Sequence, residues 1–224
     1  MGKINRLKLA VLVSGSGSNL QAIIDACAAA DYPAEIVLVF SNQPDAKGLA
    51  RAGNAGIEAK SLAHKGYPGG REAYDHAVSE LIAQSGADLV VLAGYLRLVS
   101  ESFVKRWEGR LINIHPSLLP SFKGLHAHEQ TIAAGVKHSG CTVHFVVPEM
   151  DAGPIIAQAV VPVLADDDAH SLGQRILRQE HQIYPQVIRW IAEDRVVVGN
   201  DGRVAVRGSQ SPDFAQINPV NPQG

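Results

Sequence analysis

The sequence predicts an α/β protein: a mostly parallel, twisted sheet with helices on both of its faces. Short apolar runs alternate with helical patterns through the first 115 residues, the order typical of parallel strands joined by crossover helices. One of these runs, 89–93, is apolar throughout, as expected of a strand that is covered on both sides. A loop of glycines and serines separates the first run from the first helical pattern.

The elements of this first part follow one another in a regular order. We expect strands at 8–13, 35–41, 58–62, 89–93 and 111–115. We expect helices at 19–30, 46–55, 71–84 and around 102–107. Each strand precedes a helix, so the carboxyl ends of the strands should lie at one edge of the sheet.

The pattern changes after Pro120. A short helix is expected at 127–134, two strands at 142–147 and 155–161, a long helix from about 169 to 194, and a small hairpin at 196–198 and 204–206. The three aspartates at 166–168 should cap the long helix, since acidic residues favour helix N-termini. Residues 1–207 are therefore interpreted as one domain, and 208–224, rich in Ser, Pro, Asn and Gln, as a flexible tail.

Charge, apolar runs and cysteine content indicate which kinds of binding partner and which cellular compartment to expect. The net charge of −2 over 224 residues gives no indication of a nucleic-acid or membrane partner. The apolar run near the start is too short for a signal peptide or a membrane span. Only two cysteines occur, Cys27 and Cys141, far apart and without a CxxC motif. We therefore expect a cytoplasmic protein that acts on small molecules, as a monomer or a homodimer.

A polar pair marks the end of the fifth expected strand. Side chains alternate across a strand, so Asn113 and His115 project from the same face, and Pro116 ends the strand after them. An open α/β sheet binds ligands at this end of its strands. An amide and an imidazole there can stabilise an oxyanion and transfer a proton. The alternative is a polar pair that only satisfies backbone groups.

The loop 14–20, Ser-Gly-Ser-Gly-Ser-Asn-Leu, indicates a phosphate site. It follows a strand and opens a helix, whose free N–H groups attract an anion. It matches neither a dinucleotide fingerprint, which needs a third glycine at Leu20, nor a Walker loop. The alternative is a tight turn in which Ser18 is the N-cap.

Other polar residues carry weaker signals. The Asp151 carboxylate could fix the tautomer of a neighbouring histidine or raise its pKa. Asp-Ala-Gly-Pro is, however, also an ordinary turn sequence. His126 and His128 invite a metal interpretation, but no ligand spacing supports it, and we expect no metal. His144 is interpreted as a hydrogen-bonded core residue of its strand.

Taken together, these segments resemble the phosphoribosylglycinamide formyltransferases, the folate-dependent transformylases of purine synthesis. The resemblance runs in order from about residue 8 to 198 and rests on segments 14–23, 40–42, 71–75, 90–97, 113–120, 124–126, 142–146, 150–154, 179–181 and 184–185. It implies a Rossmann-like formyltransferase fold, with a phosphate-binding half at about 8–110 and a folate-binding, catalytic half at about 111–207.

The resemblance also assigns roles to residues. It implies that Asn113, His115 and Asp151 are catalytic, and that Gly17, Ser18, Asn19 and Glu180 bind phosphoribosylglycinamide. It implies a folate site at Arg71, Leu96, Arg97, Leu98, Val99 and Asn113. Lys123 and Pro148 depart from the residues common in the family, which affects the shape of the folate loop.

The implied activity is direct transfer of a formyl group from 10-formyltetrahydrofolate, a co-substrate, to the amine of glycinamide ribonucleotide. A 10-formyltetrahydrofolate hydrolase and a methionyl-tRNA formyltransferase share the three catalytic residue types. We expect neither a regulatory domain before residue 8, as in the hydrolase, nor the separate C-terminal domain and basic surface of the tRNA enzyme. A non-catalytic phosphate- or folate-binding module is the remaining alternative.

Overall fold

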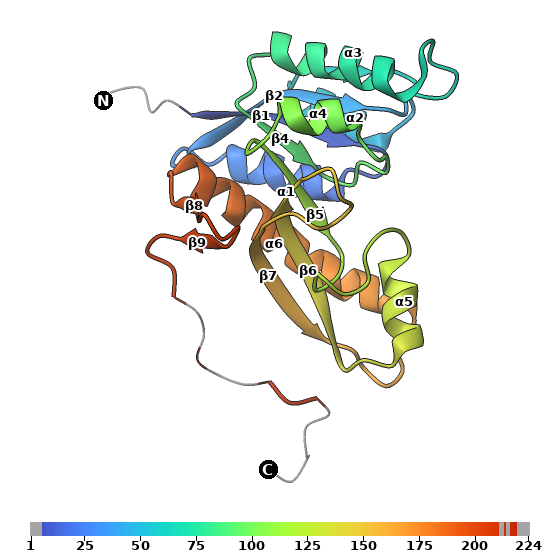
Figure 1. Ribbon diagram of the computed structural model, residues 1–224, viewed down its shortest axis with the longest axis vertical. Helices are drawn as coiled ribbons and strands as arrows, with labels where there is room; N and C mark the ends of the chain where they lie inside the picture. The colour runs from blue at the N-terminus through green and yellow to red at the C-terminus, as the bar shows by residue number, and fades with distance from the viewer. Residues whose placement is uncertain (1–5, 211–212, 214–215, 219–224) are drawn as a thin grey trace.

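The computed structural model describes residues 6–210, 213 and 216–218 and contains a seven-stranded sheet with the order β3-β2-β1-β4-β5-β6-β7 (Figure 1). Its strands are β1 (Leu7–Val13), β2 (Ala34–Ser41), β3 (Ala59–Ser61), β4 (Leu89–Leu92), β5 (Leu111–His115), β6 (His138–Phe145) and β7 (Ile155–Pro162). The first five are parallel, and β6 and β7 are antiparallel to their neighbours. The predicted α/β class with a mostly parallel sheet is confirmed.

Helices cover both faces of this sheet (Figure 1). They are α1 (Ser18–Cys27), α2 (Lys47–Asn54), α3 (Gly70–Gln84), α4 (Glu101–Arg106), α5 (Ala127–Ala134) and α6 (Ala169–Ala192). Buried side chains of α1 and α6, such as Leu20 and Ile176, pack with one set of strand residues. Those of α3 and α4, such as Tyr74 and Phe103, pack with the set on the opposite face. The alternation of side chains along each strand therefore builds two hydrophobic layers.

Strand order sets the position of the functional site. The chain builds outward from β1 to β2 and β3, then returns to place β4 on the other side of β1. The boundary between the neighbouring strands β1 and β4 is thus a topological switch point. Open α/β sheets form a crevice at such a point, at the carboxyl ends of their strands. Tyr184 of α6 fixes the long helix to this region, because its buried hydroxyl donates to Leu92 O at 2.9 Å.

Local details differ from the sequence-based expectations. The alternative in which Ser18 is the N-cap of α1 is wrong: Gly17 takes that position in a left-handed conformation (φ 68°), and no side chain caps the helix. The same helix ends at Cys27 rather than at residue 30. Strand β6 begins at His138, four residues before the expected start, because His138 to Cys141 pair with β7 although they lack an apolar pattern.

The C-terminal part begins as expected. Asp168 caps α6 by accepting from Ser171 N–H at 2.7 Å, and β8 (Val196–Val198) pairs with β9 (Val204–Val206). Of the predicted flexible tail, 211–212, 214–215 and 219–224 lie outside the described residues. Asn218 is described, and its side-chain amide donates to Lys137 O and Val163 O.

Within the part of the chain that the structure describes, none of the helices combines the length and the apolar character that crossing a bilayer requires.

Candidate active site

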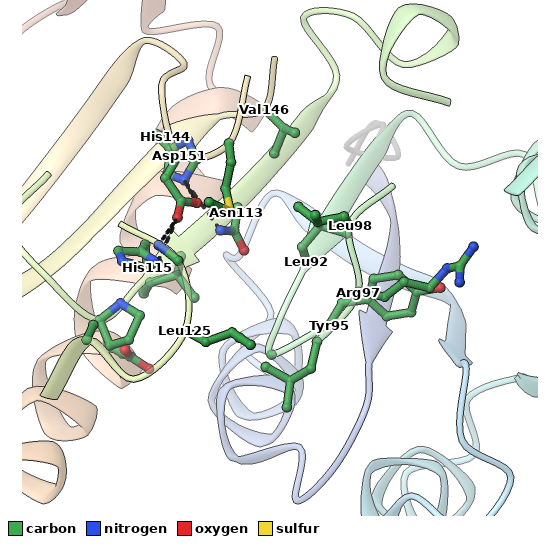
Figure 2. Close-up of a pocket in the computed structure, with 18 of the residues that line it drawn as sticks. Leu92, Tyr95, Arg97, Leu98, Asn113, His115, Leu125, His144, Val146 and Asp151 are labelled. Carbon is green, nitrogen blue, oxygen red and sulfur yellow. Dashed lines mark hydrogen bonds and ion pairs between the residues drawn. The ribbon is translucent and has the colours of Figure 1, made fainter. Parts of the chain in front are cut away.

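A cavity of about 920 Å³ opens where the ends of β4 and β5 meet α5, α6 and the loop before β7 (Figure 2). Its volume lies in the range of pockets that enclose small organic ligands. The lining combines apolar side chains, among them Leu92 and Val146, with a few polar ones that converge at one side.

Strand β5 contributes two of these polar groups to the cavity wall. Asn113 and His115 both line the cavity, as their spacing on one face of the strand predicts. The side chain of His115 is 7% exposed, and Pro116 follows where the strand ends. The pair predicted from the sequence therefore faces one cavity.

Asp151 approaches this pair from the loop between β6 and β7. Its Oδ2 lies 3.5 Å from His115 Nδ1 and accepts a hydrogen bond of 2.8 Å from Gly124 N–H. Its backbone is left-handed (φ 49°), a conformation that costs free energy for most residues but that Asp tolerates. The structure thus brings Asp151 to the side of Asn113 and His115, although it is far from both in sequence.

Both ring nitrogens of His115 face acceptors. Nε2 lies 2.8 Å from Phe122 O, and because a carbonyl can only accept, this nitrogen carries a proton. Nδ1 faces the Asp151 carboxylate. The ring is therefore held by a contact at each of its nitrogens.

His144 is a site residue that the sequence interpretation missed. It is buried and hydrogen-bonded as expected, with Nδ1 2.8 Å from Phe145 O, but it also lines the cavity. Its Nε2 lies 3.4 Å from Asn113 Nδ2 and 3.8 Å from Asp151 Oδ1. Burial lowers the pKa of His144, which keeps the ring neutral with its proton on Nδ1. The missing signal was the antiparallel register that sets Asn113 directly opposite His144.

His128 also lines the cavity, where sequence reasoning considered it only as a metal ligand. Its Nε2 is buried and has no hydrogen-bond partner within the described residues. Burial lowers the pKa of this imidazole. Over the same described ranges, no three His, Cys, Asp or Glu side chains are grouped so that they could hold a metal ion.

The loop after β1 lines a second, smaller cavity of about 180 Å³. Gly17, Ser18 and Asn19 contribute to it at the N-terminus of α1, and Asn19 and Leu96 line both cavities. A Cβ on Gly17 would lie 2.7 Å from Gly48 Cα, so this turn packs against the start of α2. Arg51 Nε donates to Ser16 O at 2.8 Å. The free N–H groups at a helix N-terminus are of the kind that attract an anion.

Glu180 of α6 lines the large cavity and contacts Asn19, which lines both cavities. Its carboxylate is buried, and its Oε2 accepts a hydrogen bond of 2.7 Å from Asn19 Nδ2. Burial raises the pKa of Glu180, and the hydrogen bond from Asn19 opposes that shift. The structure therefore joins Glu180 to the glycine-serine loop, 161 residues away in sequence.

The predicted folate residues divide into two groups. Leu96, Arg97, Leu98 and Val99 follow β4 and line the large cavity, and Leu96 and Leu98 are exposed. The guanidinium of Arg97, however, points away from the cavity (Figure 2). Arg71 lies in the first turn of α3, is exposed, and is not among the residues that line either cavity.

Comparison with known protein families gives one match over most of the chain. Residues 7–188 match the model of a family described as formyl transferase. Phosphoribosylglycinamide formyltransferase of Escherichia coli is 48% identical over 190 residues, which cover 85% of this chain and 89% of that protein. The trifunctional purine biosynthetic protein adenosine-3 of Gallus gallus is 46% identical over 91% of this chain. This chain spans only about 20% of that longer protein's length.

Solved structures give the same result. Glycinamide ribonucleotide transformylase 1 from Symbiobacterium toebii superposes with a TM-score of 0.87 and 48% identity, over 90% of this chain and 94% of that one. Phosphoribosylglycinamide formyltransferase from Anaplasma phagocytophilum gives a TM-score of 0.85 and 44% identity, over 92% and 97%. The expected Rossmann-like formyltransferase fold is confirmed by these similarities.

Proposed function

This chain belongs to the formyl transferase family, and on that premise we propose that it transfers a formyl group from 10-formyltetrahydrofolate to the amine of glycinamide ribonucleotide. One C–N bond forms between the amine and the formyl carbon, and the C–N bond to the folate nitrogen breaks. The proton that the amine loses is gained by the folate nitrogen. The convergence of Asn113, His115 and Asp151 beside a loop suited to phosphate is the observation that supports this reaction most directly.

In this proposal, Asn113 and His115 act on the formyl oxygen. The Asn113 amide and a protonated His115 donate hydrogen bonds to this oxygen as it gains negative charge. One such preorganised donor is worth about 2.7–4 kcal/mol in enzymes that form oxyanions. Asn113 and His115 are two residues apart and therefore project from the same face of β5. The strand backbone thus holds both donors in place before the substrates bind.

Asp151 handles charge and protons. Its carboxylate, 3.5 Å from His115 Nδ1, stabilises the charged imidazole. It also relays protons, through water, from the attacking amine toward the folate nitrogen. The hydrogen bond from Gly124 N–H fixes one carboxylate oxygen, so the group stays directed at the imidazole. Holding two substrates in adjoining cavities supplies further acceleration.

We assign the two cavities to the two substrates. The small cavity at Gly17, Ser18 and Asn19 takes the phosphate of the nucleotide, and Glu180 takes its amine-bearing end. The large cavity takes the folate along the 96–99 segment. Its volume and its mixture of apolar walls with convergent polar groups fit a pterin ring with hydrogen-bonding edges. Arg71, which lines neither cavity, is retained as a proposed folate residue.

An absorbance assay tests the proposal. Purified protein is mixed with 10-formyltetrahydrofolate, with and without glycinamide ribonucleotide, and the folate absorbance is followed. Turnover only with the nucleotide is the expected result. Turnover without the nucleotide would replace the proposal with the hydrolase, and no turnover with either mixture would replace it with a binding module.

The proposal includes three broader points. Residues 1–207 act as one formyltransferase unit, with its phosphate-binding half at about 8–110 and its catalytic half at about 111–207. The protein works in the cytoplasm, which its two free cysteines, Cys27 and Cys141, support. It is active as a monomer or a homodimer.

A further inference from the structure

The segment 96–99 has no regular secondary structure, although it contributes four consecutive residues to the wall of the large cavity. At its start, Leu96 N–H donates to Ser14 Oγ at 2.8 Å. At its end, Ser100 N–H donates to Asp75 Oδ2 at 2.6 Å, where Ser100 caps α4. The segment is therefore held at two points, and Asp75 of α3 is the second of them.

Asp75 also holds the middle of the segment. Its Oδ1 accepts from Arg97 at 3.0 Å from the terminal nitrogen and 3.3 Å from Nε. The Asp75 side chain is 2% exposed and that of Arg97 is 14% exposed. The guanidinium stacks over the ring of Tyr74, 4.4 Å from its centroid. Asp75 and Tyr74 are not among the residues that line the large cavity, and the guanidinium of Arg97 points away from it (Figure 2).

This arrangement changes the role of Arg97. A guanidinium that is paired with a buried carboxylate and stacked on a buried tyrosine is not available to a ligand in the cavity. Its neighbours Leu96 and Leu98, in contrast, are 72% and 59% exposed and line the cavity. Arg97 therefore anchors the segment to α3, and this leaves the side chains of Leu96 and Leu98 facing the cavity.

We infer that Asp75 is a positioning residue for the folate substrate, acting through Arg97 and Ser100 on the 96–99 segment. This inference rests on the proposed function, since it concerns the same cavity. Without the carboxylate the segment would sample other conformations, and the affinity for folate would fall with the fraction of molecules that keep the binding conformation. The small cavity shares only Leu96 with this segment. Because the Leu96 N–H is also held by Ser14 Oγ, the proposed nucleotide site should depend much less on Asp75.

The test measures binding of each substrate separately. Tetrahydrofolate and glycinamide ribonucleotide are titrated by calorimetry into the full chain, its Asp75→Asn variant and a Glu80→Gln control. Glu80 also lies on α3 and pairs with Arg106 of α4, but both side chains are exposed and neither lines a cavity. Because hydrogen bonds to a charged group are among the stronger ones in proteins, tetrahydrofolate binding to Asp75→Asn should weaken about tenfold or more. Nucleotide binding should change less than about twofold, and the control should match the unaltered chain.

Three results would decide against the inference. Equal weakening of both ligands would show a general structural role, and unchanged folate binding would show no role. If the unaltered chain binds no tetrahydrofolate, the proposed function itself fails, which is a different outcome from failure of Asp75 alone.

A second variant covers the case in which Asp75→Asn does not fold. Arg97→Lys keeps the charge pair but loses the two-nitrogen contact and the stacking on Tyr74, so tetrahydrofolate binding should weaken less than in Arg97→Met. Hydrogen exchange at the amide of Ser100 should be faster in both variants and slow again when tetrahydrofolate is added. Unchanged exchange and equal affinities in the two variants would overturn the inference.

Discussion

His144 Nε2 lies 3.4 Å from the side-chain nitrogen of Asn113, and this contact sets which way the Asn113 amide faces. His144 Nδ1 carries the ring proton, because it lies 2.8 Å from a carbonyl oxygen, so Nε2 can only accept. An acceptor there attracts the NH₂ group of Asn113 and disfavours the flipped amide. One N–H of Asn113 is thereby held at His144, and the other is free for the substrate.

We expect His144→Phe to lower kcat by roughly 10- to 100-fold, somewhat less than loss of the whole oxyanion donor. His144→Gln should retain more activity, because its side-chain oxygen can accept from Asn113. The KM for each substrate should change little, since the contact acts on the amide that serves the transition state. Steady-state kinetics of both variants check this. Equal kcat values for the two variants would contradict the orienting role.

The left-handed turn at Gly17 gives a prediction about stability and nucleotide binding. Gly17→Ala adds a methyl group 2.7 Å from Gly48 Cα at a φ that L-residues adopt at a cost of about 1–2 kcal/mol. We expect the free energy of unfolding to fall by about 1–3 kcal/mol. The KM for the nucleotide should rise, while tetrahydrofolate binding should persist.

Gly15→Ala is the matched control in the same loop. A Cβ there meets no atom within 4 Å, and Gly15 does not have a positive φ. Urea denaturation should show a clearly smaller loss of stability for Gly15→Ala. Equal losses in both variants would mean that the contact with Gly48 does not matter.

Glu180 predicts a dependence of stability on pH. Burial raises its pKa, so the folded state holds this proton more tightly than the unfolded state does. The stability contributed in this way is fully present below the ordinary carboxyl pKa and is lost as pH rises through the raised pKa. Glu180→Gln stays neutral at every pH. Above the raised pKa, Glu180→Gln should therefore be more stable than the unaltered protein. The difference should be about 1.4 kcal/mol for each unit by which the pKa of Glu180 in the folded state exceeds its pKa in the unfolded state.

Urea midpoints measured from pH 4 to 8 test this, and the advantage of Glu180→Gln should shrink toward acid. The same variant should bind the nucleotide less well. Together, the two results would show that the Glu180 carboxylate lowers the stability of the fold while it serves nucleotide binding. Glu129→Gln provides a control of opposite sign, because a backbone hydrogen bond at the start of α5 lowers the pKa of that exposed carboxyl. A Glu180→Gln variant that is less stable than the parent at pH 8 would contradict the argument.

Local patterns predict the strands better than they predict contacts between them. The bounds of β5 agree with the sequence because Leu111 to Ile114 are strand formers and Pro116 stops the strand. The alternative that made Ser18 the N-cap of α1 is wrong because Gly17, which can adopt a left-handed turn, occupies that position. His144 was taken for a core residue, since its neighbour Asn113 is known only from the register of two strands joined by a long connection. Asp75 lies in a segment that carries the family resemblance, but its role could not be predicted from the sequence, because its partners lie 22 and 25 residues away on a different element.

Asp151 allows charge to be separated from backbone conformation. Asp151→Asn keeps an oxygen that can accept from Gly124 N–H, and Asn tolerates the left-handed backbone that Asp adopts here. The fold should therefore survive, while the negative charge that faces His115 is lost. We expect kcat to fall by about 10²- to 10⁴-fold, the range typical of lost acid–base catalysis. Asp151→Ala removes the oxygen as well and strains the turn, so it should lose stability in addition to activity. Thermal unfolding combined with single-turnover kinetics distinguishes the two variants. Near-normal turnover in a folded Asp151→Asn protein would remove Asp151 from the chemistry and leave it only the role of shaping the loop.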